Sequence, residues 1–231
     1  MQMGRTMAIE RPGQLHPDYP VNLRLTGRKC LVVGGGAVAE RKVAALLEAG
    51  AAVCVVSPEV TPQLAMWAAE GRLRHEAKEF FQNAVAGCFL VFCATNLPQV
   101  NQLAATAAKE AGALVNVADA PALCDFTLPA RLVRGNFSIT VSTGGESPAL
   151  ARKLRNELNE RYGTEYGVYL DVIGKIRREW QASCPASDER CQRWRDIGDF
   201  DPEALELLRN GRIKEAEERI RHVVGGFGTQ P

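Results

Sequence analysis

The chain has 231 residues, 46% of them hydrophobic, and its 28 lysines and arginines nearly balance 27 aspartates and glutamates, so the net charge is +1. Such a chain can bury a sizeable core, as one large domain or two modest ones. The balanced charge excludes a chain-wide attraction to nucleic acid or a membrane surface, so an acidic ligand must meet a local cluster of positive charge. No apolar run approaches the roughly 20 residues of a membrane span and no apolar signal core opens the chain, so we expect a cytoplasmic protein.

The seven cysteines form no Cys-x-x-Cys pair, and Cys30, Cys54, Cys88 and Cys93 lie inside apolar runs. We therefore expect buried, reduced thiols that act as small hydrophobic residues. Because the three histidines also lie far apart in the sequence, we expect no resident metal site.

Residues 1–18 lack periodicity and predict a loose tail. The next part of the chain is organised around residues 30–50, CLVVGGGAVAERKVAALLEAG, which predict a strand, a tight turn and a helix. Gly34, Gly36 and Ala39 match G-x-G-x-x-G/A, in which the second glycine lets a pyrophosphate approach the backbone. Phosphate oxygens would meet backbone N–H groups at the positive end of a helix. The alternative is a merely structural glycine turn.

Strands and helices then alternate as far as Asp119, which predicts a parallel sheet of the Rossmann type. The further strands are expected at residues 52–56, 72–75, 88–94 and 113–118. Helices are expected at residues 62–70, with Thr61 as N-cap and Gly71 at the end, at residues 80–86, and at residues 98–111.

After Asp119 the pattern changes, and one alternating strand at residues 136–142 indicates a separate small sheet. Ser147 and Pro148 predict the N-cap and first residue of a helix that continues to about residue 162. The rest is helical and polar, with short helices at residues 202–209 and 213–224 and a loose end. We therefore divide the α/β chain into a tail, a Rossmann-like domain, a small-sheet domain and a helical domain, at residues 1–18, 19–121, 122–162 and 163–231.

Four ordered motifs resemble the sirohaem synthase family, in its precorrin-2 dehydrogenase and sirohydrochlorin ferrochelatase module. They are VVGGGAVAERK at residues 32–42, NVADAP at 116–121, CDFTLPA at 124–130 and RGNFSITVSTGGESPALARKLR at 134–155. The resemblance covers about residues 19–165. Some members also carry a uroporphyrinogen methyltransferase, for which we expect no room in this chain.

The resemblance implies NAD contacts at Ala37, Val38, Pro58 and Glu59. Together with the glycine turn and the end of the strand at 88–94, the expected cofactor-binding residues are Gly34, Gly36, Ala37, Val38, Pro58, Glu59 and Thr95. Ser57 and Pro58 stand where an acidic ribose-binding residue usually ends the second strand. No arginine follows that strand, so a 2′-phosphate has no evident partner and we expect NAD rather than NADP.

The resemblance places the catalytic aspartate at Asp119. Independently, a carboxylate at the carboxyl end of a parallel strand lies on the rim where a nicotinamide binds. The alternative is that Asp119 begins the turn at Ala120 and Pro121. Asp125 is a weaker candidate, because its neighbour Phe126 suggests a structural turn.

The implied substrate is a tetrapyrrole with many carboxylates, which requires concentrated positive charge and hydrogen-bond donors. The expected substrate-binding residues are Arg131, Arg134, Ser142, Thr143, Gly144, Ser147 and Arg152. The alternative is that the basic residues form a solvated helix face.

We therefore predict an NAD-dependent enzyme that oxidises precorrin-2 to sirohydrochlorin, with Asp119 as the base. Insertion of Fe²⁺, as a substrate, into sirohydrochlorin is left open. The small sheet needs further strands or another surface, and the resemblance implies a homodimer through it. The rival hypothesis is a non-enzymatic NAD-sensing Rossmann domain, which leaves residues 124–155 without a task.

Overall fold

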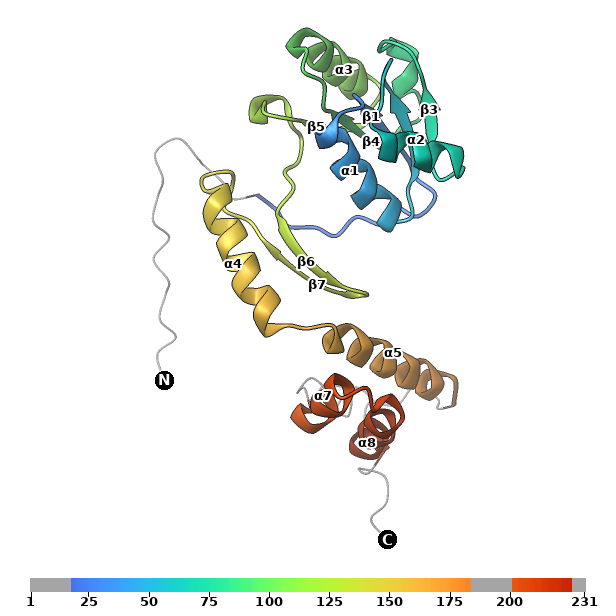
Figure 1. The fold of residues 1–231 in the computed structure, drawn as a ribbon, viewed down its shortest axis with the longest axis vertical. Coiled ribbons are helices and arrows are strands. Elements are labelled where there is room, and N and C mark those ends of the chain that lie inside the picture. Colours follow the sequence, from blue (N-terminus) through green and yellow to red (C-terminus); the bar gives the residue numbers. More distant parts are fainter. Residues whose placement is uncertain (1–17, 184–200, 226–231) are drawn as a thin grey trace. The chain divides into compact units, whose positions relative to one another are not determined.

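The computed structural model describes residues 18–183 and 201–225, so the loose segments predicted at the two ends of the chain lie essentially outside the described residues (Figure 1). The chain divides into two compact units, Met1–Leu128 and Pro129–Pro231. The division falls after Leu128, whereas the sequence placed the end of the first domain at residue 121.

The first unit is built on a parallel five-stranded sheet with the order β3-β2-β1-β4-β5. Its strands are β1 Lys29–Val33, β2 Ala52–Val56, β3 Arg74–Glu76, β4 Leu90–Cys93 and β5 Leu114–Val117. Leu31 and Val33 pack into one hydrophobic cluster, whereas Cys30 and Val32 pack into another. Because both faces of the sheet are covered, β1, β2 and β4 are largely apolar runs without polar alternation, whereas the edge strand β3 is polar.

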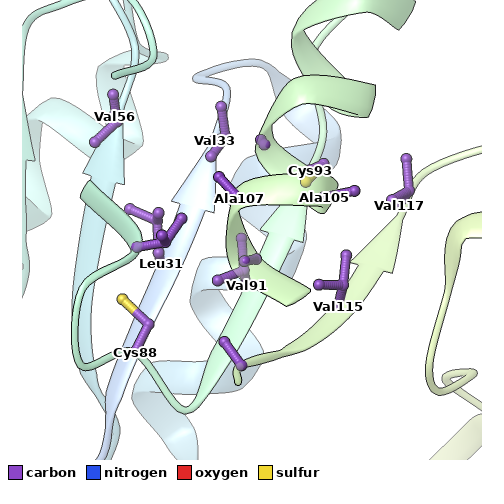
Figure 2. Packing of buried hydrophobic residues seen from close by; sticks show 14 of the residues in the cluster. Leu31, Val33, Val56, Cys88, Val91, Cys93, Ala105, Ala107, Val115 and Val117 are labelled. Carbon is purple, nitrogen blue, oxygen red and sulfur yellow. The ribbon is translucent and has the colours of Figure 1, made fainter. Parts of the chain in front are cut away.

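Helices cover both faces of this sheet. They are α1 Ala37–Glu48, α2 Pro62–Ala69 and α3 Pro98–Glu110, with two 3-10 turns, η1 Gln82–Val85 and η2 Pro121–Leu123. On the α3 face, valines of β4 and β5 and alanines of the helix belong to one buried cluster, in which Figure 2 labels Val91, Val115, Ala105 and Ala107.

The predicted cysteine environment is confirmed where the structure describes it. Cys30, Cys54, Cys88 and Cys93 are buried free thiols. Burial raises the pKa of the Cys30 thiol to about 11 and that of Cys93 to about 12, so both stay protonated and act as apolar residues.

Two expected elements of the first unit differ in detail. The strand expected at residues 72–75 begins later and ends at Glu76, because only three of its residues pair with β2, from Arg74 opposite Cys54 to Glu76 opposite Val56. The helix expected at residues 80–86 is only the 3-10 turn Gln82–Val85.

In the second unit, β6 Ala130–Arg134 and β7 Phe137–Val141 form an antiparallel hairpin, and α4 Pro148–Arg161 contacts both strands. The sequence indicated only the second of these strands. The first, ARLVR, has the apolar residues Leu132 and Val133 next to each other on opposite faces, so apolar and polar residues do not alternate along it as they do in FSITV.

The unit ends in α5 Glu165–Ser183, α7 Pro202–Arg209 and α8 Ile213–Gly225, which confirms the two short helices expected there. Tyr169 and Ile176 of α5 are buried against Leu205 of α7 and Ile220 of α8. Within residues 18–183 and 201–225, no helix combines the length and apolar character needed to cross a membrane.

Candidate functional site

The carboxyl edge of the parallel sheet gathers the loops that carry the predicted cofactor and catalytic residues of the first unit. The Gly34 N–H donates to the Val56 carbonyl oxygen (3.0 Å), the Ala94 N–H to Val33 (2.8 Å) and the Ala118 N–H to Cys93 (2.9 Å). These bonds extend the strand pairing by one residue, so the loops after β1, β4 and β5 all begin at the carboxyl edge of the sheet. In the order β3-β2-β1-β4-β5, the chain switches direction between β1 and β4, which is where open α/β sheets bind ligands.

The three glycines of the turn after β1 have different tasks. Gly34 has a φ of 118°, and a Cβ there would lie 2.4 Å from the Ala94 carbonyl oxygen. A Cβ on Gly35 would lie 1.9 Å from the Glu59 carbonyl oxygen, whereas a Cβ on Gly36 would meet nothing within 4 Å. The fold therefore requires the first two glycines, and the third leaves open space above the start of α1. Sequence reasoning missed Gly35, because its partner comes from another loop.

The start of α1 presents backbone donors to that space. The first intrahelical bond runs from the Glu40 N–H to the Gly36 carbonyl oxygen (3.0 Å), so Ala37 and Val38 have no acceptor one turn earlier in the helix. Ala39 is fully buried, which confirms the close contact of helix and sheet expected from the motif. These donors at the positive end of a helix suit an anionic phosphate.

The loop after β2 is tied to the glycine turn. The Thr61 N–H donates to the Gly35 carbonyl oxygen (2.9 Å), and the Ser57 hydroxyl donates to the Glu59 carbonyl oxygen (2.7 Å). Pro58 and Glu59 are exposed in this loop. Thr61 also accepts from the Leu64 N–H (3.3 Å), which confirms the predicted helix cap.

Thr95 borders the glycine turn, because a Cβ on Gly34 would lie 3.1 Å from the Thr95 nitrogen. Its own polar groups bind Asn101 of α3: the Thr95 N–H and hydroxyl donate to Asn101 Oδ1 (3.1 and 2.8 Å), and Asn101 Nδ2 donates to the Thr95 carbonyl oxygen (3.0 Å). Asn101 is buried and was missed from the sequence. The available signal was a polar residue on the apolar face of the predicted helix.

Asp119 lies two residues after the end of β5 with a φ of 59°, and it is the one non-glycine residue in the described part of the chain with a left-handed backbone. Its side chain is exposed. Aspartate tolerates this conformation better than most residues, yet it is uncommon and clusters at functional sites.

Asp125, the weaker catalytic candidate, instead binds β5, the last strand of the sheet, and the neighbouring helix α3. Its Oδ2 accepts from the Val115 N–H (3.0 Å), and its Oδ1 lies 3.2 Å from Lys109 Nζ on α3. The neighbouring Phe126 packs edge-on against Phe92, with ring centroids 5.6 Å apart. The predicted structural turn at this position is therefore confirmed.

In the second unit, most of the predicted substrate-binding residues lie in the loop between β7 and α4. The Ser142 hydroxyl accepts from the Gly144 N–H (3.3 Å) and the Thr143 hydroxyl from the Ser147 N–H (3.2 Å). Ser147 caps α4 by accepting from the Leu150 N–H (3.2 Å), as expected. Four of the predicted residues are thus within one short loop.

The structure separates the predicted arginines. Arg152 is exposed on α4, one turn after that loop, and Arg131 is exposed on β6 opposite Thr140. Arg134 instead donates to Asn159 Oδ1 (2.7 Å) near the end of α4. At about 1.5 Å per residue, Asn159 is about 18 Å along the helix from Ser147, so Arg134 is not brought to the loop. In the described ranges, no group of three or more His, Cys, Asp or Glu side chains is arranged to hold a metal ion.

A parallel sheet with a glycine turn and an open helix start at its switch point defines the first unit as a Rossmann-type dinucleotide-binding domain. A family model described as "Putative NAD(P)-binding" matches residues 21–130, and one described as "Sirohaem biosynthesis protein central" matches residues 134–161. The chain belongs to the sirohaem synthase family, as its four motifs indicated.

Relatives match both units. The siroheme synthase of Nitrosococcus oceani is 43% identical over 209 residues, and that of Methylobacillus flagellatus is 37% identical over 209 residues. Each match covers 90% of this chain but only 44% of the relative, so the chain spans less than half the length of these proteins. The solved structure of SirC, a precorrin-2 dehydrogenase, matches over 100% of its length and 87% of this chain, with 31% identity and a TM-score of 0.70.

Proposed function

We propose that the protein is an NAD-dependent dehydrogenase that oxidises precorrin-2 to sirohydrochlorin in sirohaem biosynthesis. The observation that carries this proposal is the left-handed Asp119 on the same sheet edge as the glycine turn. The match to a precorrin-2 dehydrogenase over its whole length supports the choice of substrate.

The residues at the edge fit NAD. The open space above Gly36 accommodates a pyrophosphate, and Ala37 and Val38 offer it backbone N–H groups. Pro58 and Glu59 are exposed beside them. Residues 57–61 contain no lysine or arginine that would receive a 2′-phosphate, which favours NAD over NADP.

The proposed oxidation removes one hydride and one proton from the substrate. NAD, held at the glycine turn by the N–H groups of Ala37 and Val38, would supply the hydride acceptor. Asp119 takes the proton from the substrate carbon framework and, being exposed, releases it to water. Its place after β5 positions the carboxylate at the rim where a nicotinamide ring lies in folds of this class.

The loop before α4 is the proposed recognition element for substrate carboxylates. Ser142, Thr143 and Ser147 accept backbone N–H bonds, so each hydroxyl keeps a proton to donate. The Gly144 backbone, Arg131 and Arg152 complete this set. We assign Arg134 to holding the hairpin against α4, because its guanidinium is bound to Asn159.

We propose a homodimer formed through the second unit. The hairpin has only two strands, and a sheet of that size needs further support. Leu150 and Leu154 are 48% and 37% exposed one turn apart on α4, and Val133 of β6 is 41% exposed. A second copy of this surface would cover them.

We also propose that Fe²⁺, as a substrate, is inserted into sirohydrochlorin and that Asp119 is the carboxylate that accepts the pyrrole protons. A cytoplasmic location fits the described cysteines, all of which are free thiols.

The test is a two-stage assay on the purified wild-type protein. In the first stage, NAD and enzymatically prepared precorrin-2 should give NADH and the sirohydrochlorin absorbance spectrum. In the second stage, Fe²⁺ is added to supplied sirohydrochlorin without NAD. Absence of both NADH and a new chromophore in the first stage would favour the rival NAD-sensing domain.

A further inference from the structure

The β5 edge of the sheet is covered by the segment after η2, which bonds β5 through side chains and through one backbone bond, from the Asp125 N–H to the Val115 carbonyl oxygen (2.8 Å). β5 is the edge strand, and the N–H groups of Val115 and Val117 point away from β4. Asp125 accepts the first of these (3.0 Å) and the Cys124 sulfur accepts the second (3.1 Å). The segment after η2 thus returns along β5 and satisfies its exposed donors.

Of the two side chains, Cys124 alone spans the turn that carries Asp119. Its sulfur receives the Val117 N–H before the turn, and its S–H lies within reach of the Ala120 carbonyl oxygen after the turn (3.5 Å) and of the Val117 carbonyl oxygen (3.4 Å). The Cys124 N–H also donates to the Pro121 carbonyl oxygen (3.0 Å). One thiol therefore connects the residues on both sides of Asp119.

Asp125 also binds a backbone N–H group of β5, but away from the turn that carries Asp119. Its carboxylate binds Val115 and Lys109, so it fastens β5 to the end of α3 and makes no contact across the Asp119 turn that the structure records. The two caps are neighbours in sequence but hold different parts of the edge.

We infer that Cys124 is a positioning residue for Asp119, whose left-handed backbone it holds by bonding Val117 and Ala120. The inference rests on the proposed role of Asp119 as the base. A strained backbone persists only where its surroundings determine it. Loss of the thiol lets the turn relax, and a displacement of about 1 Å in a reacting group can reduce the rate about a hundredfold.

A first measurement is independent of activity. Amide hydrogen exchange is followed in the wild-type protein, Cys124→Ala and Asp125→Ala. We expect the Val117 amide to exchange about tenfold faster in Cys124→Ala, in line with the loss of one hydrogen bond, while Val115 is unchanged. Asp125→Ala should give the reverse pattern. An unchanged Val117 amide in Cys124→Ala would overturn the inference.

The second measurement is the rate of NADH formation with precorrin-2. Cys124→Ala should lower kcat by about tenfold to a hundredfold without changing the NAD dissociation constant, whereas Asp125→Ala should keep the wild-type kcat. Cys124→Ser should recover most of the loss, because a hydroxyl also accepts and donates. It also provides the comparison if the alanine variant folds poorly.

The decisive arm combines Cys124→Ala with Asp119→Asn. Since Asp119→Asn has already removed the base, adding Cys124→Ala should cause no further loss of kcat. A wild-type kcat in Cys124→Ala, or an equal loss in the Asp119→Asn background, would show that the thiol does not act through Asp119. Wild-type turnover in Asp119→Asn alone would instead refute the base assigned in the proposed function, and this inference with it.

Discussion

Asp119 shows how much one residue depends on its backbone. Few side chains accept a φ near its value of 59°, and the short polar side chains of aspartate and asparagine are among them. The side chain is exposed, so its carboxylate is held in place through the backbone of the turn and not by burial.

Replacing Asp119 by asparagine should therefore separate chemistry from folding. Asparagine fits the left-handed backbone but cannot accept a proton at neutral pH. We expect kcat with precorrin-2 to fall by about 10² to 10⁴, with the NAD dissociation constant and the melting temperature unchanged. NADH absorbance, ligand titration and thermal unfolding measure the three quantities. A variant that keeps wild-type turnover would exclude Asp119 as the base.

The glycine turn offers a matched pair of substitutions. Gly36→Val places a side chain in open space, where the pyrophosphate is proposed to lie, so NAD binding should weaken by at least about tenfold while stability is retained. Gly35→Ala forces a Cβ against the Glu59 carbonyl oxygen and should lower the free energy of unfolding by about 1–3 kcal/mol. NAD titration and denaturant unfolding distinguish the two. Equal effects on binding and stability at Gly36 would contradict the proposed cofactor site.

At the scale of elements, helices in both units begin with an N-cap residue followed by a proline. Thr61, Ser147 and Asp201 each precede a proline and accept an N–H bond from the first turn of the helix that follows. Since the cap and the proline are adjacent in the chain, the amino-acid sequence alone is enough to locate such helix starts.

Asp201 caps α7 and also pairs with Arg219 of α8, with Oδ2 2.7 Å from Nε. Desolvation opposes its charge, but the bonds from Arg219 and from the amides of Ala204 and Glu203 outweigh it and lower the pKa of Asp201. Because the folded-state pKa is depressed, this stabilisation is present above the unfolded pKa of about 3.9 and is lost as pH falls through the folded value.

We therefore expect Asp201→Ala to reduce the free energy of unfolding by about 1 kcal/mol at neutral pH, and the difference from wild type to shrink below about pH 4. Denaturant unfolding at several pH values measures it. Glu203→Gln is the control, because it weakens an exposed pair with Arg219 and keeps the cap. A difference that persists undiminished at low pH would contradict the electrostatic part of the argument.

At the scale of the whole molecule, the testable property is the proposed self-association. Leu150→Lys combined with Leu154→Lys introduces two charges on the exposed apolar strip of α4. Burial of each leucine contributes about 1.5–3 kcal/mol, so the dimer dissociation constant should rise more than about tenfold. Sedimentation at micromolar concentration measures it, and Asn156→Lys adds a charge to the same helix as a control. A wild-type monomer would refute the dimer.

Much of the first unit could be predicted because its signals are local. The strand, glycine turn and helix at residues 29–48 are contiguous, and Thr61 and Ser147 cap helices that start one residue later. Asp119 could be placed at the end of a strand because residues 113–118 are mostly apolar and β-branched residues are frequent among them. The strand at Ala130–Arg134 could not, since Leu132 and Val133 are adjacent and break the alternation of apolar and polar residues.

The sequence by itself determined the parallel α/β class, the helix starts and the position of Asp119 at the end of a strand, because propensity, apolar periodicity and caps act over a few residues. The tertiary structure decided the tasks of Gly35, Asn101, Cys124 and Arg134. Each depends on a partner from another segment: the Glu59 carbonyl, the Thr95 turn, the edge of β5 and Asn159. Such partners meet only when the strands pair and the helices pack, so no pattern of neighbouring residues reveals them.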